Sequence, residues 1–497
     1  MHSKHWWEPR QLVFPLVIGA TFILVLGPLV DPDLFWHLAN GRWMLSTHTI
    51  PRTDPFSFTM SGKEWICHEW LTEIVMYSIY RGLGPVALMI AWAAVIAAAF
   101  GLVLLRCRTW PYLGAICTLL AVLASAPILG VRPQMISLLL ASLTLYIVES
   151  GVTLWTLVPI SAVWANLHGG FFTGAALIGA YALGEAIDTL ILHTQNQADG
   201  KRHIKQLTLT ALGMAVASLL NPYGVKLILY PFQTLASGAM RLHITEWLSP
   251  DFHKLAFQPL ALFLLALVAS LAFSPKRPST THLLMLLGSL YAALNSARHI
   301  PLFTLVAAPV LSEQLASVLP GRWAFQRVTN SGKAATSGMP AGSFLPRQQQ
   351  KRFGIFFALV IVATLALGIV WRVRAVVAYN EAAQRSSYPV AATDALRQVD
   401  AAGNLFNAYN WGGYLIWRGE KVFIDGRADL YGDAFFNQYS QLYYGQTRAA
   451  DAFQRYDIRR VLIEAHSALA TFLDGDSRWQ RVYQDDQAVL FVRVEAR

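Results

Sequence analysis

Residues 31–70 read DPDLFWHLANGRWMLSTHTIPRTDPFSFTMSGKEWICHEW and lie between two strongly apolar segments. The titratable side chains of this stretch include Asp31, Asp33, His37, Arg42, Asp54, Glu64, His68 and Glu69. Acidic side chains next to a membrane span are costly unless they are paired, hydrated or bound to a ligand. The stretch is therefore either a solvated loop or an active-site loop on the membrane surface. Its tryptophans favour the second reading, because their amphipathic rings suit the headgroup level.

The composition of the whole chain indicates a membrane protein. Of its 497 residues, 55% are hydrophobic, and the mean hydropathy is +0.41, which is too apolar for a soluble protein. The net charge of +10 comes from basic residues in short loops between apolar runs, so it is a topology signal and argues against nucleic-acid binding. Cys67, Cys107 and Cys117 form no disulfide framework and no CxxC metal pair.

Apolar runs predict about eleven membrane spans, since a span needs roughly 20 apolar residues and fewer where neighbouring helices shelter it. The expected spans are 11–30, 84–105, 111–127, 134–149, 152–166, 171–192, 208–221, 257–274, 282–296, 300–318 and 353–372. Basic residues gather in loops 106–110, 193–207, 275–281 and 319–352. By the positive-inside rule these loops are cytoplasmic, which places the N-terminus inside and the C-terminal part outside. Residues 69–82 predict an amphipathic helix before the second span.

Composition divides the chain into four parts. Residues 1–318 are a transmembrane module with the acidic outer loop 31–70, 319–352 a basic cytoplasmic linker, 353–372 the last span, and 373–497 an extracytoplasmic domain. In that domain we expect helices over 388–399 and 433–444, strands over 404–406, 421–424 and 461–464, and a hairpin of 479–483 with 488–494. The predicted fold class is a polytopic α-helical membrane protein with a small C-terminal α/β domain.

Asp31, Asp33 and Glu69 are the candidate catalytic residues. A transfer to a hydroxyl or an amine needs a general base, and a carboxylate can take the proton. Asp31 and Asp33 are also spaced to bind a divalent metal, Mg or Mn, that would balance a phosphate leaving group. His37, His68 and His168 form an alternative metal set with carboxylates, although no HxxxH or HExxH spacing supports it.

Basic residues on the same outer side are candidate substrate-binding residues. Arg132 in GVRPQ, and Arg298 with His299 in SARHIP, each lie where a span begins or ends. Arginine binds phosphate oxygens in a bidentate fork and stays charged at low dielectric. The alternative is that both arginines are interfacial anchors. His168 in NLHGG is a further ligand-binding candidate or a hydrogen-bonded turn residue, and Glu246 is one more carboxylate on this side.

Two motifs of the C-terminal domain complete the candidate set. Trp411 and Tyr414, in NAYNWGGYLIW, resemble a platform on which a sugar ring stacks. Asp425 and Arg427, in FIDGRADLYG, follow a predicted strand, where α/β domains often carry functional loops. The alternative for this pair is an internal ion pair that fixes the loop. The domain has no P-loop and no GxGxxG, which disfavours nucleotide binding.

These residues resemble the GT-C superfamily of polytopic glycosyltransferases, which use polyprenyl-phosphate sugar donors. Asp31 and Asp33 lie where that family has its acidic motif, directly after the first span. Glu69 is similar to the second acidic residue of protein mannosyltransferase-like members. Over nearly its full length the chain also resembles a group of bacterial membrane proteins with the pattern DPDxxWH, HEW, RPQ, NLHGG, NPYG, RHIP, WGGYL and DGRxDLYG. The WGGY at 411–414 departs from the WWDYG of oligosaccharyltransferases, because it lacks the Asp.

The resemblance implies a glycosyltransferase, hexosyl- or pentosyl-, of the bacterial inner membrane. It would transfer a sugar from a polyprenyl-phosphate carrier to a lipid, glycan or protein acceptor on the extracytoplasmic face. A lipid or glycan flippase is an alternative, but it needs ionisable residues deep within the spans, and the chain has few there. A non-enzymatic envelope assembly protein that uses its C-terminal domain to bind partners is a second alternative.

Overall fold

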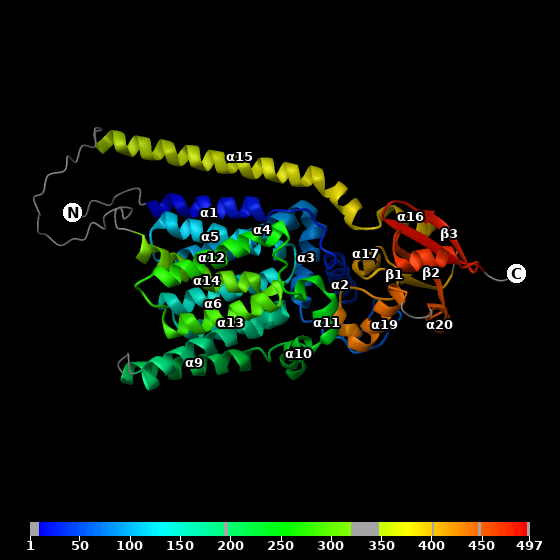
Figure 1. The fold of residues 1–497 in the computed structure, drawn as a ribbon, viewed down its shortest axis with the longest axis horizontal. Helices are drawn as coiled ribbons and strands as arrows, with labels where there is room; N and C mark the ends of the chain where they lie inside the picture. Colours follow the sequence, from blue (N-terminus) through cyan, green and yellow to red (C-terminus); the bar gives the residue numbers. More distant parts are fainter. Residues whose placement is uncertain (1–8, 193–196, 320–346, 400–401, 446–448, 495–497) are drawn as a thin grey trace, which may run out of the picture.

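The computed structural model describes residues 9–192, 197–319, 347–399, 402–445 and 449–494. Most of the expected linker, 319–352, lies outside these residues. The described chain folds into a long bundle of helices with a small sheet-containing domain at one end (Figure 1). This arrangement confirms the predicted fold class.

All the expected spans coincide with helices. These are α1 (Pro9–Val25), α4 (Pro85–Arg106), α5 (Pro111–Ser125), α6 (Gln134–Ser150), α7 (Leu157–Leu167), α8 (Phe172–Ala186), α9 (Gln197–Ala217), α12 (Gln258–Phe273), α13 (Thr280–Asn295), α14 (Ile300–Val318) and α15 (Arg347–Ser387). Within the described part of the chain, six helical stretches are long and apolar enough to cross a membrane: 85–106, 111–128, 169–191, 255–273, 297–318 and 359–387. The protein is thus a multi-pass membrane protein, and the count of eleven spans stays a prediction.

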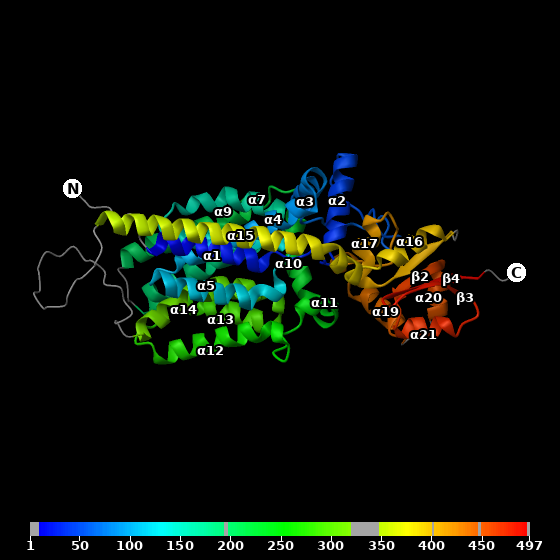
Figure 2. The same ribbon diagram turned by 90° about the horizontal axis from the view of Figure 1, so that it is seen from above.

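The degree of burial differs between the central and the outer helices of the bundle. Helix α4 is apolar on all sides and buries Trp92 and Phe100 completely, as a helix surrounded by neighbours should. Helix α15 lies on the outside, where Figures 1 and 2 both show it running along α1. A Cβ at Gly19 of α1 would lie 2.9 Å from a methyl group of Leu365, so the glycine permits this close packing.

Short helices cover the end of the bundle that faces the C-terminal domain. The acidic stretch forms α2 (Leu34–Thr47), a helix that we did not predict, and α3 (Trp70–Leu83), which agrees with the expected helix over 69–82. Figure 2 shows α2 running across the direction of α1 and α15. Helices α10 (Val225–Ala236) and α11 (Gly238–His243) lie at the same end (Figure 1).

The C-terminal domain has one four-stranded sheet in the order β1-β2-β4-β3. Its strands are β1 (Asn404–Asn407), β2 (Ile458–Glu464), β3 (Trp479–Gln484) and β4 (Ala488–Arg493). Strand β1 is parallel to β2, and the other pairs are antiparallel, including the expected hairpin. Its helices are α16 (Val390–Gln398), α17 (Gly412–Trp417), α18 (Ala428–Tyr431), α19 (Asp433–Tyr443), α20 (Ala449–Arg455) and α21 (Ala468–Asp474).

The expected strand over 421–424 is not part of this sheet, so that prediction was wrong. The segment is buried, but its backbone pairs with the acidic stretch 31–70 of the membrane module. Val422 forms a parallel bridge with Ser57, and its N–H donates to the carbonyl of Phe56 at 3.3 Å. The carbonyl of Val422 accepts from the N–H of Phe58 at 3.2 Å. A buried backbone needs partners, and here a segment about 365 positions away supplies them.

Candidate active site

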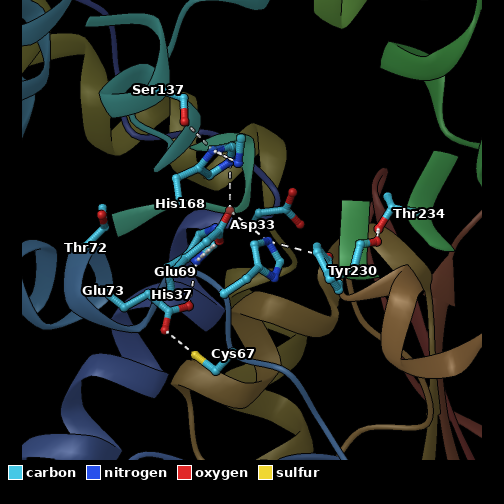
Figure 3. Close-up of polar contacts among 12 residues, drawn as sticks. Asp33, His37, Cys67, Glu69, Thr72, Glu73, Ser137, His168, Tyr230 and Thr234 are labelled. Atoms are coloured by element: carbon cyan, nitrogen blue, oxygen red, sulfur yellow. Dashed lines mark hydrogen bonds and ion pairs between the residues drawn. The ribbon is translucent and has the colours of Figure 1, made fainter. Parts of the chain in front are cut away.

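A cavity of about 740 Å³ lies where the bundle meets the C-terminal domain. This volume falls in the range of roughly 300–1,000 Å³ that is usual for ligand sites. Seven of the predicted site residues line it, and they come from widely separated parts of the chain: Asp33, Glu69, Arg132, His168, Arg298, His299 and Arg427. Asp31, Trp411, Tyr414 and Asp425 do not line it. Figure 3 shows the side chains of Asp33, Glu69, His37 and His168 close to one another.

Asp33 immediately precedes α2 and directs its carboxylate into the cavity. Its Oδ1 accepts a hydrogen bond from the indole N–H of Trp36 at 3.1 Å, and its own backbone N–H donates to Oδ1 of Asp31 at 2.9 Å. Burial and the negative charge of Asp31 raise the pKa of Asp33 to about 7, although Arg132 and His37 oppose the shift. A carboxyl group with this pKa exchanges a proton readily at neutral pH, which suits general acid–base chemistry.

The C-terminal domain packs its backbone directly against this carboxylate. A Cβ at Gly426 would lie 1.8 Å from Oδ1 of Asp33, so no other residue fits there without displacement. A Cβ at Gly413 would lie 2.7 Å from the carbonyl oxygen of Pro32. The glycines of the WGG and DGR motifs therefore permit close approach of the domain to the residues around Asp33.

Two arginines and two further carboxylates form an ion-pair network beside Asp33. Arg132, which precedes α6, pairs with both Asp31 and Glu246. Arg298 lies 3.9 Å from Glu246 and stacks over the ring of Trp247 with its guanidinium carbon 4.5 Å from the ring centroid. Together with Asp33, the set holds three carboxylates and two guanidinium groups. Arg132 is thus neutralised within the protein, whereas Arg298 has one long ion pair.

Glu69 lies among three histidine side chains. Its Oε1 is 3.3 Å from Nε2 of His68 and 3.2 Å from Nε2 of His168, and its Oε2 is 3.3 Å from Nδ1 of His37. Burial would raise the pKa of Glu69, but His68 and His37 hold it well below its usual value. Because both oxygens are occupied, Glu69 is an ionised anchor that positions the histidines.

The three histidines differ in charge. Burial lowers the pKa of His68, but the charge of Glu69 more than offsets this and raises it to about 9, so His68 is a cation at neutral pH. Burial lowers the pKa of His168, which therefore stays neutral. Its Nδ1 accepts from the N–H of Gly170 at 2.9 Å, so its proton is on Nε2 and points at Glu69.

A second buried carboxylate lies behind His37. Glu73, one turn after Glu69 on α3, accepts from Nδ1 of His37 at 2.9 Å and from the amide of Asn40 at 2.5 Å. The Cys67 thiol donates to Glu73 at 3.1 Å. Burial opposes the charge on His37, but Glu69 and Glu73 outweigh it and raise the pKa of His37. The chain of contacts fixes His37 and leaves the edge of its ring on the cavity wall.

The arrangement does not fit a divalent cation on Asp31 and Asp33 as predicted. Arg132 occupies one oxygen of Asp31, and the N–H of Asp33 occupies the other. His37, Glu69 and Glu73 place ligand atoms within 4.8 Å of one another, but these atoms are already joined by hydrogen bonds and ion pairs. Nδ1 of His168 is also used as an acceptor, which leaves no free nitrogen on a neutral ring. The metal stays a prediction, and no step below depends on it.

Three predicted residues, Trp411, Tyr414 and Asp425, serve the packing of the site and do not line the cavity. Trp411 and Tyr414 are only 4% and 6% exposed, so neither ring is open to a sugar in this structure. Tyr414 stacks instead on Tyr388 at 5.1 Å between ring centroids. Asp425 is fully buried and binds the guanidinium of Arg427, whose other partner is Asp54 of the first outer loop at 2.7 Å. The internal ion-pair reading of this motif is therefore the one that the geometry supports.

Sequence reasoning gave no role to several residues that line the cavity. His37 and His68 were considered only as metal ligands, and Tyr230 was not considered at all. Tyr230 of α10 stacks on His68 at 4.3 Å between ring centroids. The HEW sequence at 68–70 was a usable signal, because a His next to a Glu at the end of a polar loop often forms a charged pair.

Comparisons with known proteins identify the fold. The structure is similar to archaeal oligosaccharyltransferase AglB from Archaeoglobus fulgidus, in complex with an inhibitory peptide and a dolichol-phosphate, with a TM-score of 0.53, 10% identity, and coverage of 93% of this chain and 69% of that one. The apo form of the A. fulgidus oligosaccharyltransferase matches with a TM-score of 0.50 and 12% identity, covering 93% of this chain and 70% of that one. ArnT from Cupriavidus metallidurans bound to undecaprenyl phosphate matches with a TM-score of 0.48 and 14% identity, covering 100% of this chain and 99% of that one.

No protein-family model and no curated protein sequence matches the chain. The identities to solved structures are all low, so these likenesses bear on the fold. The resemblance found in the sequence motifs and the similarity in three dimensions agree with each other. The chain shares its fold with these oligosaccharyltransferase structures.

Proposed function

We propose that the protein is a GT-C-type glycosyltransferase of the bacterial inner membrane. It takes a sugar from a polyprenyl-phosphate donor and transfers it to an acceptor on the extracytoplasmic face. The observation that carries the proposal is Asp33, a carboxyl group with a pKa of about 7 that faces a cavity beside Arg132, Arg298 and His68. The dolichol-phosphate bound by A. fulgidus AglB supports a donor of this class.

The residues of the cavity divide naturally between the two halves of such a transfer. Asp33 accepts the proton from the acceptor hydroxyl, whose oxygen attacks C1 of the donor sugar. The bond between C1 and the phosphate oxygen breaks, and the polyprenyl phosphate leaves with the electron pair. The cations Arg298 and His68 stabilise the negative charge on the leaving phosphate. Arg132 helps by keeping Asp31 and Glu246 paired, so that they do not repel that phosphate.

The experiment is to incubate the purified full chain with a panel of polyprenyl-phosphate sugars and measure the released polyprenyl phosphate. Asp33→Asn keeps the shape of the side chain but removes the base, so release falls by about 10²–10⁴-fold. Asp251→Asn is the matched control, because the Asp251 side chain is 44% exposed, pairs with Lys254 and does not line the cavity.

Two outcomes contradict the proposal. Equal release by wild type and Asp33→Asn removes Asp33 from the chemistry. Binding of donors by folded wild-type protein without any release, accompanied by donor-dependent flux across proteoliposomes, assigns the protein to the flippase class instead.

A further inference from the structure

We propose that the acceptor is a glycan, and that its terminal sugars lie in an arm of the cavity built from the C-terminal domain. This inference rests on the proposed function and specifies its acceptor. The arm, called the tyrosine arm below, is made by Tyr409, Tyr443, Tyr444 and Glu464, with the buried ring of Tyr439 packed behind them. All four line the same cavity as Asp33, and none of them takes part in the contacts that hold the catalytic carboxylates.

The tyrosine arm begins next to Asp33. The hydroxyl of Tyr409 donates to the carbonyl of Gly426 at 3.3 Å, and Gly426 is the residue whose backbone packs on the Asp33 carboxylate. The negative charge of Asp33 is among the causes that raise the pKa of Tyr409 well above its usual value, after burial itself. A ligand that reaches from the arm toward Asp33 therefore passes the edge of Tyr409.

From Tyr409 the aromatic rings continue outward without a break. The ring of Tyr409 lies 5.1 Å from Phe436, and Phe436 lies 6.4 Å from Tyr439, measured between centroids. Tyr439 stacks on Tyr443 at 5.6 Å, and Tyr443 meets Tyr444 edge-on at 5.4 Å. Tyr444 is 62% exposed, so the series ends at the open side of the cavity.

A carboxylate lies at the far part of the arm. Glu464, the last residue of β2, accepts a hydrogen bond from the hydroxyl of Tyr443. In the described part of the chain no Lys, Arg or His forms an ion pair with Glu464, and burial raises its pKa. A half-buried carboxylate with one hydroxyl partner retains acceptor capacity for the hydroxyl groups of a ligand. Asn410, exposed in the same cavity, adds an amide donor and acceptor.

Ring faces alternating with hydroxyl, amide and carboxylate groups match a saccharide better than the other two acceptor classes. A sugar ring has an apolar C–H face that packs on an aromatic ring and an edge of hydroxyls that forms hydrogen bonds. An alkyl chain would offer no hydrogen bond to Glu464 or Asn410 and would displace the water around them, which is unfavourable. A phosphate-rich acceptor would be repelled by Glu464.

A peptide acceptor would need free backbone groups on the wall, and the arm offers few at its inner end. The N–H of Tyr409 already donates to the hydroxyl of Tyr439 at 2.9 Å, and the N–H of Ala408 donates to Leu462 at 3.1 Å. An extended peptide usually adds to a sheet edge through such groups. The side chains of the arm, and not its backbone, are what a ligand meets here.

The experiment measures saccharide binding directly on the purified full chain. Saturation-transfer NMR is recorded with methyl glycosides of glucose, galactose, mannose and N-acetylglucosamine and with short oligosaccharides. Tyr444→Ala removes the exposed ring, and Glu464→Gln removes the charge while keeping the shape. We expect each to weaken binding by roughly tenfold, the effect of one charged hydrogen bond or one well-packed ring. Tyr379→Ala on α15 and Glu420→Gln are matched controls outside the cavity.

Donor-dependent release of polyprenyl phosphate separates this inference from the proposed function. Saccharide binding that is lost in Tyr444→Ala and Glu464→Gln but kept in Asp33→Asn supports the tyrosine arm, whatever the donor chemistry proves to be. Saccharide binding that none of these variants changes, or a peptide panel whose binding both arm variants abolish, overturns it. Donor release without any saccharide binding overturns the arm and leaves the transferase proposal standing.

Discussion

The two ends of α6 each carry buried charges, but in opposite states. At its last turn Glu149 receives Arg106 in a bidentate pair, with Nη2 to Oε1 at 2.7 Å and Nε to Oε2 at 3.0 Å. The hydroxyl of Tyr181 donates to the same carboxylate at 2.7 Å, and Nη1 of Arg106 donates to the carbonyl of Leu305 at 2.6 Å. Neither residue of the pair lines the cavity. Arg106 and Glu149 thus neutralise each other at this end.

At the start of α6 the charges do not balance. Arg132 forms ion pairs with Asp31 and Glu246. Asp33 is a third carboxylate, and its side chain accepts a hydrogen bond only from the indole N–H of Trp36. The excess negative charge and the burial raise the pKa of Asp33 to about 7, and the group faces open space. Burial of charge alone therefore does not mark a site in this protein. A buried acid that its neighbours fail to neutralise, beside a cavity, does.

Removing one partner of the Arg106–Glu149 pair has the largest expected effect, which is a loss of folding stability. Arg106→Met leaves Glu149 buried without its counter-charge, which costs about 3–5 kcal/mol of folding free energy. The double variant Arg106→Met with Glu149→Leu recovers most of this loss, because no charge is left buried. Thermal unfolding in detergent measures both. Lys276→Met removes an exposed pair with Glu313 and serves as control, at about 0–1 kcal/mol. A destabilisation by Lys276→Met as large as that by Arg106→Met would contradict the assignment.

The second prediction concerns a substitution beside Asp33, at the start of α6, that changes no charged residue. Gly426→Ala pushes a methyl group into Oδ1 of Asp33, so either the carboxylate or the C-terminal domain must move. A misplacement of about 1 Å reduces transfer roughly 10²-fold, and release of polyprenyl phosphate measures it. Gly82→Ala is the matched control, since its Cβ meets nothing within 4 Å. Equal activity of Gly426→Ala and wild type would show that this contact does not position Asp33.

These two ends also show what a sequence can and cannot predict. The helices of the bundle follow from runs of apolar residues, a local property, and every expected span coincides with a helix. The acidic stretch was found from charge next to a span, which is also local. The sequence indicated Arg106 only as a topology signal. Its ion pair with Glu149 joins two helices, and the two residues lie 43 positions apart in the chain.

Several contacts that assemble the site join residues still farther apart in sequence. Glu69 contacts His168, and Arg427 contacts Asp54 across 373 positions. No periodicity or spacing encodes such contacts. The glycines at 412–413 were read as part of an open stacking platform, but a Cβ at Gly412 would meet the carbonyl of Ile424 at 2.3 Å. Residue type indicated that the backbone approaches something closely, and only the fold shows what it approaches.

A smaller effect is expected on the pH dependence of transfer, which tests whether Asp31 raises the pKa of Asp33. If Asp33 is the base, it must be ionised, so activity rises as the pH increases through about 7 and is lost below it. Asp31→Asn removes a negative charge that raises the pKa of Asp33 and frees Arg132, which lowers it. Both changes act in the same direction, and the midpoint moves to lower pH by roughly one unit, equivalent to about 1.4 kcal/mol. A pH–rate profile of kcat/KM measures the shift, and a midpoint that moves upward would contradict it.

The smallest expected effect on function comes from the aromatic residues that the sequence favoured for sugar stacking. Trp411 is 4% exposed and lies outside the cavity, whereas Tyr444 of the tyrosine arm lines it. Trp411→Phe keeps a ring in the core and removes part of its packing, so the free energy of unfolding falls by about 1–3 kcal/mol while saccharide binding changes less than about twofold. Saturation-transfer NMR measures saccharide binding by Trp411→Phe and by Tyr444→Ala under the same conditions. If Trp411→Phe weakened saccharide binding as much as Tyr444→Ala does, the domain would open in solution to expose Trp411, and the acceptor site would include the WGG motif.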